Sequence, residues 1–466
     1  MRKILLTTAA VFGTVAGMAG GAYAQSTAPA LPAPNGMWGV GGAGAPPTNS
    51  SESAAPGLEA PGSFVVHLNG RLNYYVGVEG DTTNNITTSA GTNKNGNFEF
   101  EGYIRLYPGF DAVAANGLQY GVVGEIRNPG SNSTATGAGA SGNSSQNTLY
   151  WRIAYGYLGL PEFGTLSFGQ QQSSAGLLDV GAFVGFNDGG WDGDVPSFIG
   201  GGPGGGYGPA PDYPFTGFGN MYTVNRVLYM SPNFSGFRFG FGYAPNNNAL
   251  INTENCTVAG SGCNRFISGP QTANPYSGIR YNNVVDAAAN YTNTFGPIGL
   301  AMMGSFYGAT PTVNTAPGAV KYEPMAVGAF GATVSFAGFT VGGQFKWGDE
   351  AGQWAVMPQG GKPMTAWLAG AQYATGPIVV GASYFTYQYT GNFYGTATTR
   401  NPTGMETDNG LAAGGTFAVA PGLSFYLSYL YGQRHQYDFN FNTDTTGLAN
   451  NNVNSQAFAI GTVLKW

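Results

Sequence analysis

The sequence predicts an all-β fold, a transmembrane antiparallel β-barrel of sixteen strands with a long third loop that folds inward. Three observations lead to this prediction. Apolar and polar residues alternate along one candidate strand after another, as they do where lipid lies outside a barrel and water inside. The links between these strands are alternately short and long. After residue 24, no run of about 18 apolar residues could form a spanning helix.

The amino-terminal segment precedes the predicted barrel. Arg2 and Lys3 are followed by an apolar stretch and by Ala22-Tyr23-Ala24, the pattern of a signal peptide (residues 1–24) cleaved after Ala24. A membrane anchor is the alternative, and the lack of a later stop-transfer stretch disfavours it. Residues 25–63 are rich in Ala and Pro without periodicity, which predicts a flexible periplasmic leader. This leader could also enter the barrel or contact the cell wall.

The composition favours strands and argues against several classes of protein. Glycine accounts for 78 of 466 residues, which suits strands joined by many turns. Charged residues make up 9% of the chain, whereas soluble domains carry about a quarter. The aromatic content of 14% argues against disorder. The formal charge is −6, and loss of the two signal-peptide cations makes it −8. An acidic chain is not expected to bind nucleic acid.

The candidate strands follow one another from residue 64 to residue 466. Along the first strand, residues 64–80, Leu68 and Leu72 face outward and Arg71 faces inward. The second and third strands begin near Phe98 and Leu118 and alternate in the same way. Further strands are predicted to begin near Thr148, Phe163, Thr223, Phe234, Val284, Leu300, Tyr322, Phe339, Met364, Ile378, Thr407, Leu423 and Ser455.

The links support a barrel whose two rims differ. Short links such as 161–164 and 420–422 alternate with long links rich in Asn, Gly, Ser and Thr, of which 171–222 is the longest. Outer-membrane barrels have short periplasmic turns and long external loops. An even number of strands places both termini on the periplasmic side, as an exported leader requires.

The last strand, residues 455–466, alternates up to a terminal aromatic residue and has no tail to cover an open sheet edge. We therefore expect it to pair with the first strand and close the barrel. It also resembles the carboxy-terminal signal of bacterial outer-membrane barrels, which implies recognition by the barrel-assembly machinery. Gly461, Leu464 and Trp466 match that signal, and Ala459 stands where a polar residue is usual.

Two local patterns complete a family resemblance. Residues 152–160 with 163–170 look like a strand, turn and strand before a long loop, and 227–237 look like the hairpin after it. Together they resemble the general diffusion porins of Gram-negative bacteria, over roughly residues 64–466. The resemblance implies a homotrimer surrounded by outer-membrane lipid. It also implies passive diffusion of small hydrophilic solutes and ions, without a cofactor and without catalysis.

The same resemblance implies that the loop at about 171–222 narrows the pore and places carboxylates opposite arginines. The acidic candidates are Asp179, Asp188, Asp192 and Asp194. The basic candidates are Arg71, Arg105, Arg127 and Arg152. Opposed charges across a narrow pore create a transverse field in which polar solutes can orient. Alternatively, each aspartate is a solvated or turn-forming residue, and the arginines pair with wall glutamates such as Glu125.

The remaining candidate sites are few. Cys256 and Cys263 are the two cysteines, and export with an even count predicts a disulfide within the link 244–282. That link offers too few ligands for a metal site. The two histidines, His67 and His435, lie in no catalytic motif, so we expect no enzymatic activity.

Two other functions stay open. A channel selective for sugars or for a particular anion would present a ladder of inward aromatic side chains. The candidates for such a ladder are Tyr75, Tyr103, Tyr107 and Tyr426. A structural or adhesive barrel would instead have a closed lumen.

Overall fold

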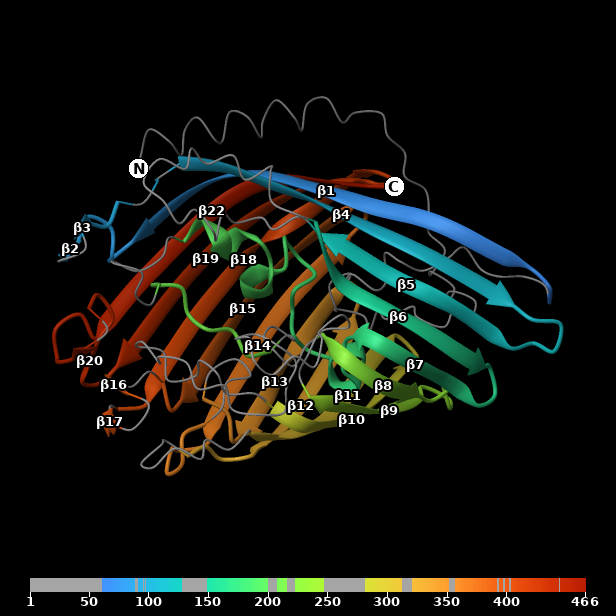
Figure 1. The fold of residues 1–466 in the computed structure, drawn as a ribbon. Helices are drawn as coiled ribbons and strands as arrows, with labels where there is room; N and C mark the ends of the chain where they lie inside the picture. The colour runs from blue at the N-terminus through green and yellow to red at the C-terminus, as the bar shows by residue number, and fades with distance from the viewer. Residues whose placement is uncertain are drawn as a thin grey trace.

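The computed structural model describes residues 61–88, 91–94, 96, 98–127, 149–199, 208–215, 223–246, 281–311, 321–351, 357–391, 394–396, 399–401, 404–443 and 445–466. Within these ranges sixteen strands form one closed antiparallel barrel, as predicted (Figure 1). The barrel strands are β1 (Phe64–Asp81), β4 (Phe98–Val113), β5 (Gln119–Arg127), β6 (Tyr150–Leu160), β7 (Gly164–Gln171), β8 (Val224–Met230), β9 (Phe237–Asn246), β10 (Tyr281–Phe295), β11 (Ile298–Pro311), β12 (Met325–Phe336), β13 (Phe339–Gly348), β14 (Met364–Thr375), β15 (Ile378–Tyr389), β18 (Glu406–Ala420), β19 (Leu423–Gln436) and β22 (Asn452–Lys465).

Short strands and helices lie in the links. The pairs β2 (Thr87–Thr88) with β3 (Gly91–Thr92), β16 (Tyr394–Thr396) with β17 (Thr399–Asn401), and β20 (Phe439–Asn440) with β21 (Thr445–Thr446) form small hairpins. The link between β7 and β8 contains α2 (Ser174–Leu177), η2 (Gly190–Asp192) and η3 (Val195–Phe198). In the described part of the chain, no helix has the length and apolar character needed to cross a membrane.

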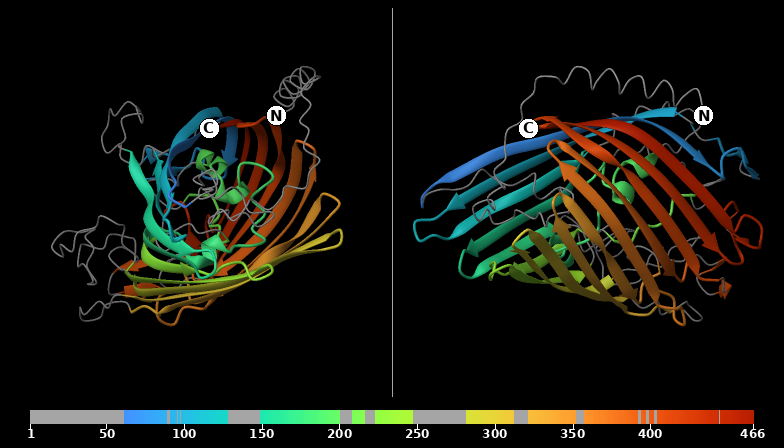
Figure 2. Two further views of the ribbon diagram at one scale, coloured as in Figure 1. Left: turned by 90° about the vertical axis from the view of Figure 1, so that its right-hand side faces the viewer. Right: turned by 180° about the vertical axis from the view of Figure 1, so that it is seen from behind.

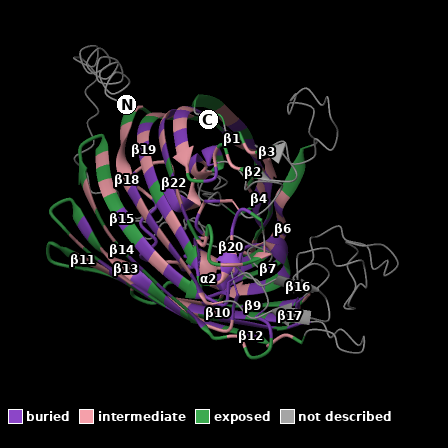
Figure 3. Ribbon diagram, turned by 90° about the vertical axis from the view of Figure 1, so that its left-hand side faces the viewer, coloured by how far each residue is buried: buried purple, intermediate pink, exposed green. Residues whose placement is uncertain are grey.

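The alternation of side chains follows the sequence pattern. On β1, Val66, Leu68 and Leu72 face outward and are exposed, whereas Arg71 and Asn73 face the lumen and are buried. Exposed and buried residues form alternating bands along the strands around the whole wall (Figure 3). The exposed side chains are apolar because the outer face contacts lipid. The inner face carries polar and small side chains together with apolar residues such as Phe385.

The turns at one rim are short. Pro421-Gly422 alone joins β18 to β19, and Gly422 adopts a φ of +77° that other residues rarely take. Two-residue connections of this kind hold neighbouring antiparallel strands in a fixed register.

The barrel closes through its last residues. β22 pairs with β1 in antiparallel register, from Arg71 opposite Lys465 to Asp81 opposite Ser455. Beyond the strand, the Trp466 amide donates to the Gly70 carbonyl and the Gly70 amide donates to the Trp466 carbonyl, each at 3.1 Å. The Trp466 ring lies against Gly70, where a β-carbon would overlap it.

Deleting Trp466 should therefore weaken closure of the barrel. It removes two backbone hydrogen bonds, worth about 1 kcal/mol each, together with the ring contact on Gly70. We expect a lower urea midpoint for unfolding from lipid vesicles, whereas Trp466→Phe keeps both bonds and should retain most of the stability. Equal midpoints for the wild type and the deletion would contradict this.

The core of the protein lies inside the barrel. The described parts of the β7–β8 link, residues 172–199 and 208–215, lie within the ring of strands (Figure 2). Phe183, Phe186, Trp191 and Phe198 of the link pack with wall residues such as Phe385 into one buried cluster. Burying such side chains contributes about 1.5–3 kcal/mol each, so the link is held as a packed element of the structure.

Candidate functional site

The β7–β8 link, called here the constriction loop (residues 171–222), is fastened where it leaves the wall. Ser173 accepts a hydrogen bond from the Gly176 amide at 3.2 Å and so caps α2. The Ser174 amide donates to Asp286 on β10 at 2.6 Å, and Asp286 also pairs with Arg226 on β8. A buried ion pair thus holds the start of the loop against the wall.

The loop then follows the inner wall across several strands. The Thr416 hydroxyl donates to the Phe186 carbonyl at 3.3 Å. The Asn187 amide donates to the Ser428 hydroxyl at 3.1 Å, and the Trp191 indole donates to the Leu411 carbonyl at 3.2 Å. These bonds tie the loop to β18 and β19.

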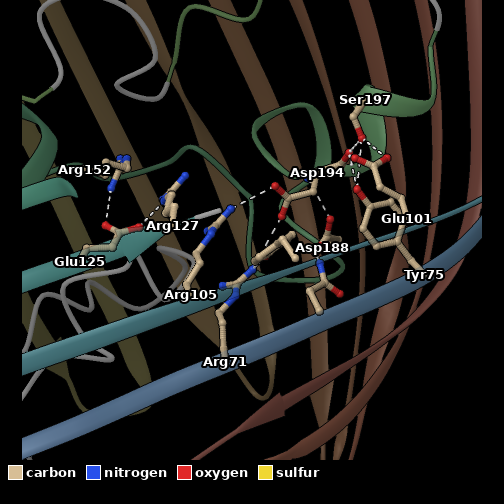
Figure 4. Close-up of polar contacts among 12 residues, drawn as sticks. Arg71, Tyr75, Glu101, Arg105, Glu125, Arg127, Arg152, Asp188, Asp194 and Ser197 are labelled. Carbon is tan, nitrogen blue, oxygen red and sulfur yellow. Dashed lines mark hydrogen bonds and ion pairs between the residues drawn. The ribbon is translucent and has the colours of Figure 1, made fainter. Parts of the chain in front are cut away.

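The tip of the loop meets β1 and β4, where two predicted arginines lie. Asp194 accepts from Arg105 at 3.1 Å and lies 3.8 Å from Arg71. Asp188 accepts from Asn73 on β1 at 3.0 Å and from the Asp194 amide at 2.9 Å. Arg71 and Arg105 point from the wall toward the loop carboxylates (Figure 4). The structure therefore brings Asp188 and Asp194 together with Arg71 and Arg105.

Neighbouring groups fix this arrangement. The ring of Tyr103 contacts both guanidinium groups, with its centroid 5.1 Å from that of Arg71 and 4.1 Å from that of Arg105. On the loop side, Ser197 donates to Glu101 on β4 at 2.5 Å, and Tyr75 donates to the Asp194 carbonyl at 3.2 Å. The loop tip is thus held by polar contacts on both sides of Asp194.

The other two predicted arginines pair within the wall. Arg127 on β5 and Arg152 on β6 both bind Glu125, Arg152 at 2.7 Å (Figure 4). Glu125 is 1% exposed, whereas the arginine side chains are 13% and 12% exposed. The alternative expectation, that the arginines pair with wall glutamates such as Glu125, therefore holds for Arg127 and Arg152. One carboxylate shared by two guanidinium groups leaves this part of the wall with a positive charge.

The remaining loop carboxylates lie elsewhere. Asp179 accepts from Gln344 on β13 at 2.6 Å, which places it away from β1 and β4. Asp192 lies in η2 next to Trp191, and Trp191 packs against Phe385 on β15 and donates to Leu411 on β18. Asp212 accepts from Tyr389 at 2.9 Å. Burial raises the pKa of Asp179 to about 7. Burial and then the Asp194 carboxylate raise the pKa of Asp188 to about 7.

The return segment of the loop, residues 208–215, is anchored to β18 and β19. Arg434 on β19 donates to the Gly208 carbonyl at 2.8 Å and pairs with Glu406 at 2.6 Å and Asp408 at 3.6 Å. The Asp212 amide donates to Asp408 at 2.7 Å. This cluster of opposite charges is buried inside the barrel.

A family model described as Gram-negative porin matches residues 7–437 of the sequence. The chain belongs to the Gram-negative porin family. This porin is therefore an outer-membrane channel for passive diffusion of small hydrophilic solutes, and its family is one of channels rather than enzymes. No curated protein matches its sequence.

Solved porin structures share the fold. The anion-selective porin from Comamonas acidovorans superimposes with a TM-score of 0.50 at 15% identity, covering 87% of this chain and 100% of that one. The outer-membrane channel DcaP of Acinetobacter baumannii superimposes with a TM-score of 0.50 at 10% identity, covering 88% of this chain and 100% of that one. Salmonella typhi OmpF superimposes with a TM-score of 0.47 at 14% identity, covering 86% of this chain and 97% of that one. At these identities, the likeness to the first two structures concerns the fold.

Several residues of the site were not found from the sequence. Asn73, Tyr103 and Ser197 complete the contacts around Asp188 and Asp194. The alternation along β1 and β4 predicts that Asn73 and Tyr103 face inward, but no sequence motif marks them as partners of the loop. Cys256 and Cys263, and with them the predicted disulfide, lie outside the described residues, as do the signal peptide and most of the leader.

Proposed function

We propose that the porin is a general diffusion channel whose narrowest section lies between the tip of the constriction loop and the β1–β6 wall. Asp188 and Asp194 form its acidic side, and Arg71, Arg105, Arg127 and Arg152 form its basic side. The supporting observation is the position of the Asp194 carboxylate on the inward loop, 3.1 Å from Arg105 and 3.8 Å from Arg71. Fixed opposite charges there orient polar solutes and make apolar solutes give up ordered water.

A channel selective for sugars is less well supported. The four tyrosines that could form an aromatic ladder are buried, Tyr103 at 6% exposure and Tyr107 at 0%. Tyr75 packs its ring edge-on against Phe198, with the centroids 5.0 Å apart, and the Tyr426 hydroxyl donates to Asn73 at 3.0 Å. Rings packed in this way do not offer their faces to a passing sugar.

We further propose a processed and assembled form of the porin. Residues 1–24 are removed as a signal peptide, and residues 25–63 form a periplasmic leader. The barrel-assembly machinery recognises the strand that contains Gly461, Leu464 and Trp466, and three copies form a homotrimer. Cys256 and Cys263 form a disulfide in the link 244–282. The resemblance to general diffusion porins, and the export signal in the sequence, support these steps.

The experiment that tests the channel is single-channel recording of the detergent-extracted protein in a planar bilayer under a salt gradient. We expect large open steps that arrive in groups of three, without block by any one sugar. Small steps blocked by one sugar would favour a substrate-selective channel. The absence of steps from correctly folded protein would favour a structural barrel.

Ion preference should depend on pH with a midpoint of about 7, the value to which the pKa of Asp188 is raised. Below this pH the carboxyl is protonated and neutral, and above it the carboxylate attracts cations. Acidification from pH 8 to pH 6 should therefore shift the reversal potential toward anions. Asp188→Asn should reduce this step and leave only the part due to Asp179, whose pKa is also raised to about 7. A step of undiminished size in that variant would assign the titration to another group.

A further inference from the structure

Five glycines of the barrel wall face the lumen directly under the constriction loop. We call them the loop-facing glycines: Gly77 on β1, Gly331 on β12, Gly370 on β14, Gly381 on β15 and Gly432 on β19. At each of them, the atom nearest to an added β-carbon would belong to the loop. The loop partners are Phe198, Val180, Phe183, Phe186 and Pro211, in the same order.

The backbone conformation at these five positions does not require glycine. None of the five has a positive φ, so other residues could adopt their conformation. Glycine inside a strand is unfavourable, because it loses more conformational freedom and packs no side chain. Within a strand, it marks a place where another part of the structure approaches closely. Here that part is the constriction loop.

The space between wall and loop is too small for a methyl group. A β-carbon on Gly370 would lie 2.5 Å from Cγ of Phe183, and one on Gly381 would lie 2.7 Å from Cγ of Phe186. Carbon atoms in contact prefer separations of about 3.5–4.0 Å. A single methyl group would therefore require the loop to move away from the wall by about 1 Å.

We propose that the loop-facing glycines are positioning residues that set the width of the pore. They allow the loop to lie flat on the wall from β12 round to β1. The tip of the loop consequently reaches β1 and β4, where Asp194 lies 3.1 Å from Arg105, and the proposed passage runs beside Arg127 on β5 and Arg152 on β6. Because packed interiors transmit displacements rather than absorb them, a larger residue at these positions moves the loop into the open passage. The inference rests on the proposed function, in which that passage conducts.

The test is Gly370→Ala in the full-length porin, recorded in a planar bilayer. Close packing should transmit the displacement to the loop edge, so we expect conductance to fall roughly 1.5-fold. The largest polyethylene glycol that enters the pore should also become smaller. The matched control is Gly304→Ala on β11, where nothing lies within 4 Å of an added β-carbon. This control should conduct like the wild type.

A compensating variant separates loop position from general damage. All three atoms that the new methyl group would meet belong to Phe183, whose φ of +48° suits glycine. Gly370→Ala combined with Phe183→Gly should therefore restore the wild-type conductance and polymer cutoff. Gly381→Ala, which meets Phe186, should reproduce the fall and gives a second measurement if Gly370→Ala does not insert.

The outcomes separate the two proposals. An unchanged conductance in both alanine variants, or a fall that Phe183→Gly does not reverse, would overturn the role of the glycines while the wild type still conducts. A folded wild type that does not conduct would instead contradict the proposed function.

Discussion

Replacing Asp188 and Asp194 together by asparagine should shift the permeability ratio of the porin toward anions by roughly 10-fold. A unit charge about 4 Å from a passing ion is worth about 1 kcal/mol even at the dielectric constant of water. At pH 8, where Asp188 is ionised, the double variant removes two negative charges and leaves Arg71 and Arg105 without the carboxylate that they now face. Asparagine has nearly the same shape, so the contact with Asn73 can be kept.

The measurement is the reversal potential in a salt gradient, and Asp192→Asn is the matched control. Asp192 lies on the same loop, two residues from Asp194, but beside Trp191 and the β15–β18 wall. The Asp192→Asn variant removes one charge by the same change of side chain, and it should shift the reversal potential much less than the double variant does. Equal shifts for the control and the double variant would mean that the whole loop, and not its contact with the arginines, determines ion preference.

Replacing Arg434 by methionine should destabilise the porin by about 3–5 kcal/mol, the cost of leaving a buried charge without its partner. Arg434 is the cation that faces Glu406 and Asp408, and these carboxylates are 0% exposed. The variant also loses the bond to the Gly208 carbonyl. The return segment of the loop should therefore loosen, and channel current should become noisier.

Urea unfolding in lipid vesicles measures this effect, with Arg238→Met as the control. Arg238 also lies on a barrel strand, β9, and has no ion pair among the described residues. Its replacement removes the same charge and should cost far less. Stability losses of equal size in the two variants would show that the Arg434 cluster contributes nothing specific.

The barrel itself was predictable from the sequence because its rules are local. A strand between lipid and water alternates with a period of two. The outward positions of Leu68 and Leu72 therefore implied that Arg71 faces inward, and the same alternation along the second strand implied this for Arg105. Link length distinguished the two rims. The structure confirms the sixteen strands, but several begin up to three residues from the expected position. For example, β9 begins at Phe237 where Phe234 was expected, and β22 begins at Asn452 where Ser455 was expected.

The partners of the charges were only partly predictable. Four aspartates and four arginines were candidates, but the structure brings Asp188 and Asp194 to Arg71 and Arg105 and places Asp179 at Gln344. The loop has no repeating pattern that relates sequence position to direction. Its route depends on contacts with residues more than a hundred positions away, such as Ser428 and Leu411.

The alternating strands, the closure of the barrel and the inward arginines follow from local sequence patterns, because hydrophobic periodicity and turn chemistry act between near neighbours. The position of the constriction loop depends instead on contacts between distant segments. Glycine was expected at turns, yet Gly370 and Gly381 lie within strands, where the loop aromatics Phe183 and Phe186 cover them. Close packing between distant segments requires glycine at those positions, and such packing produces no repeating pattern in the sequence.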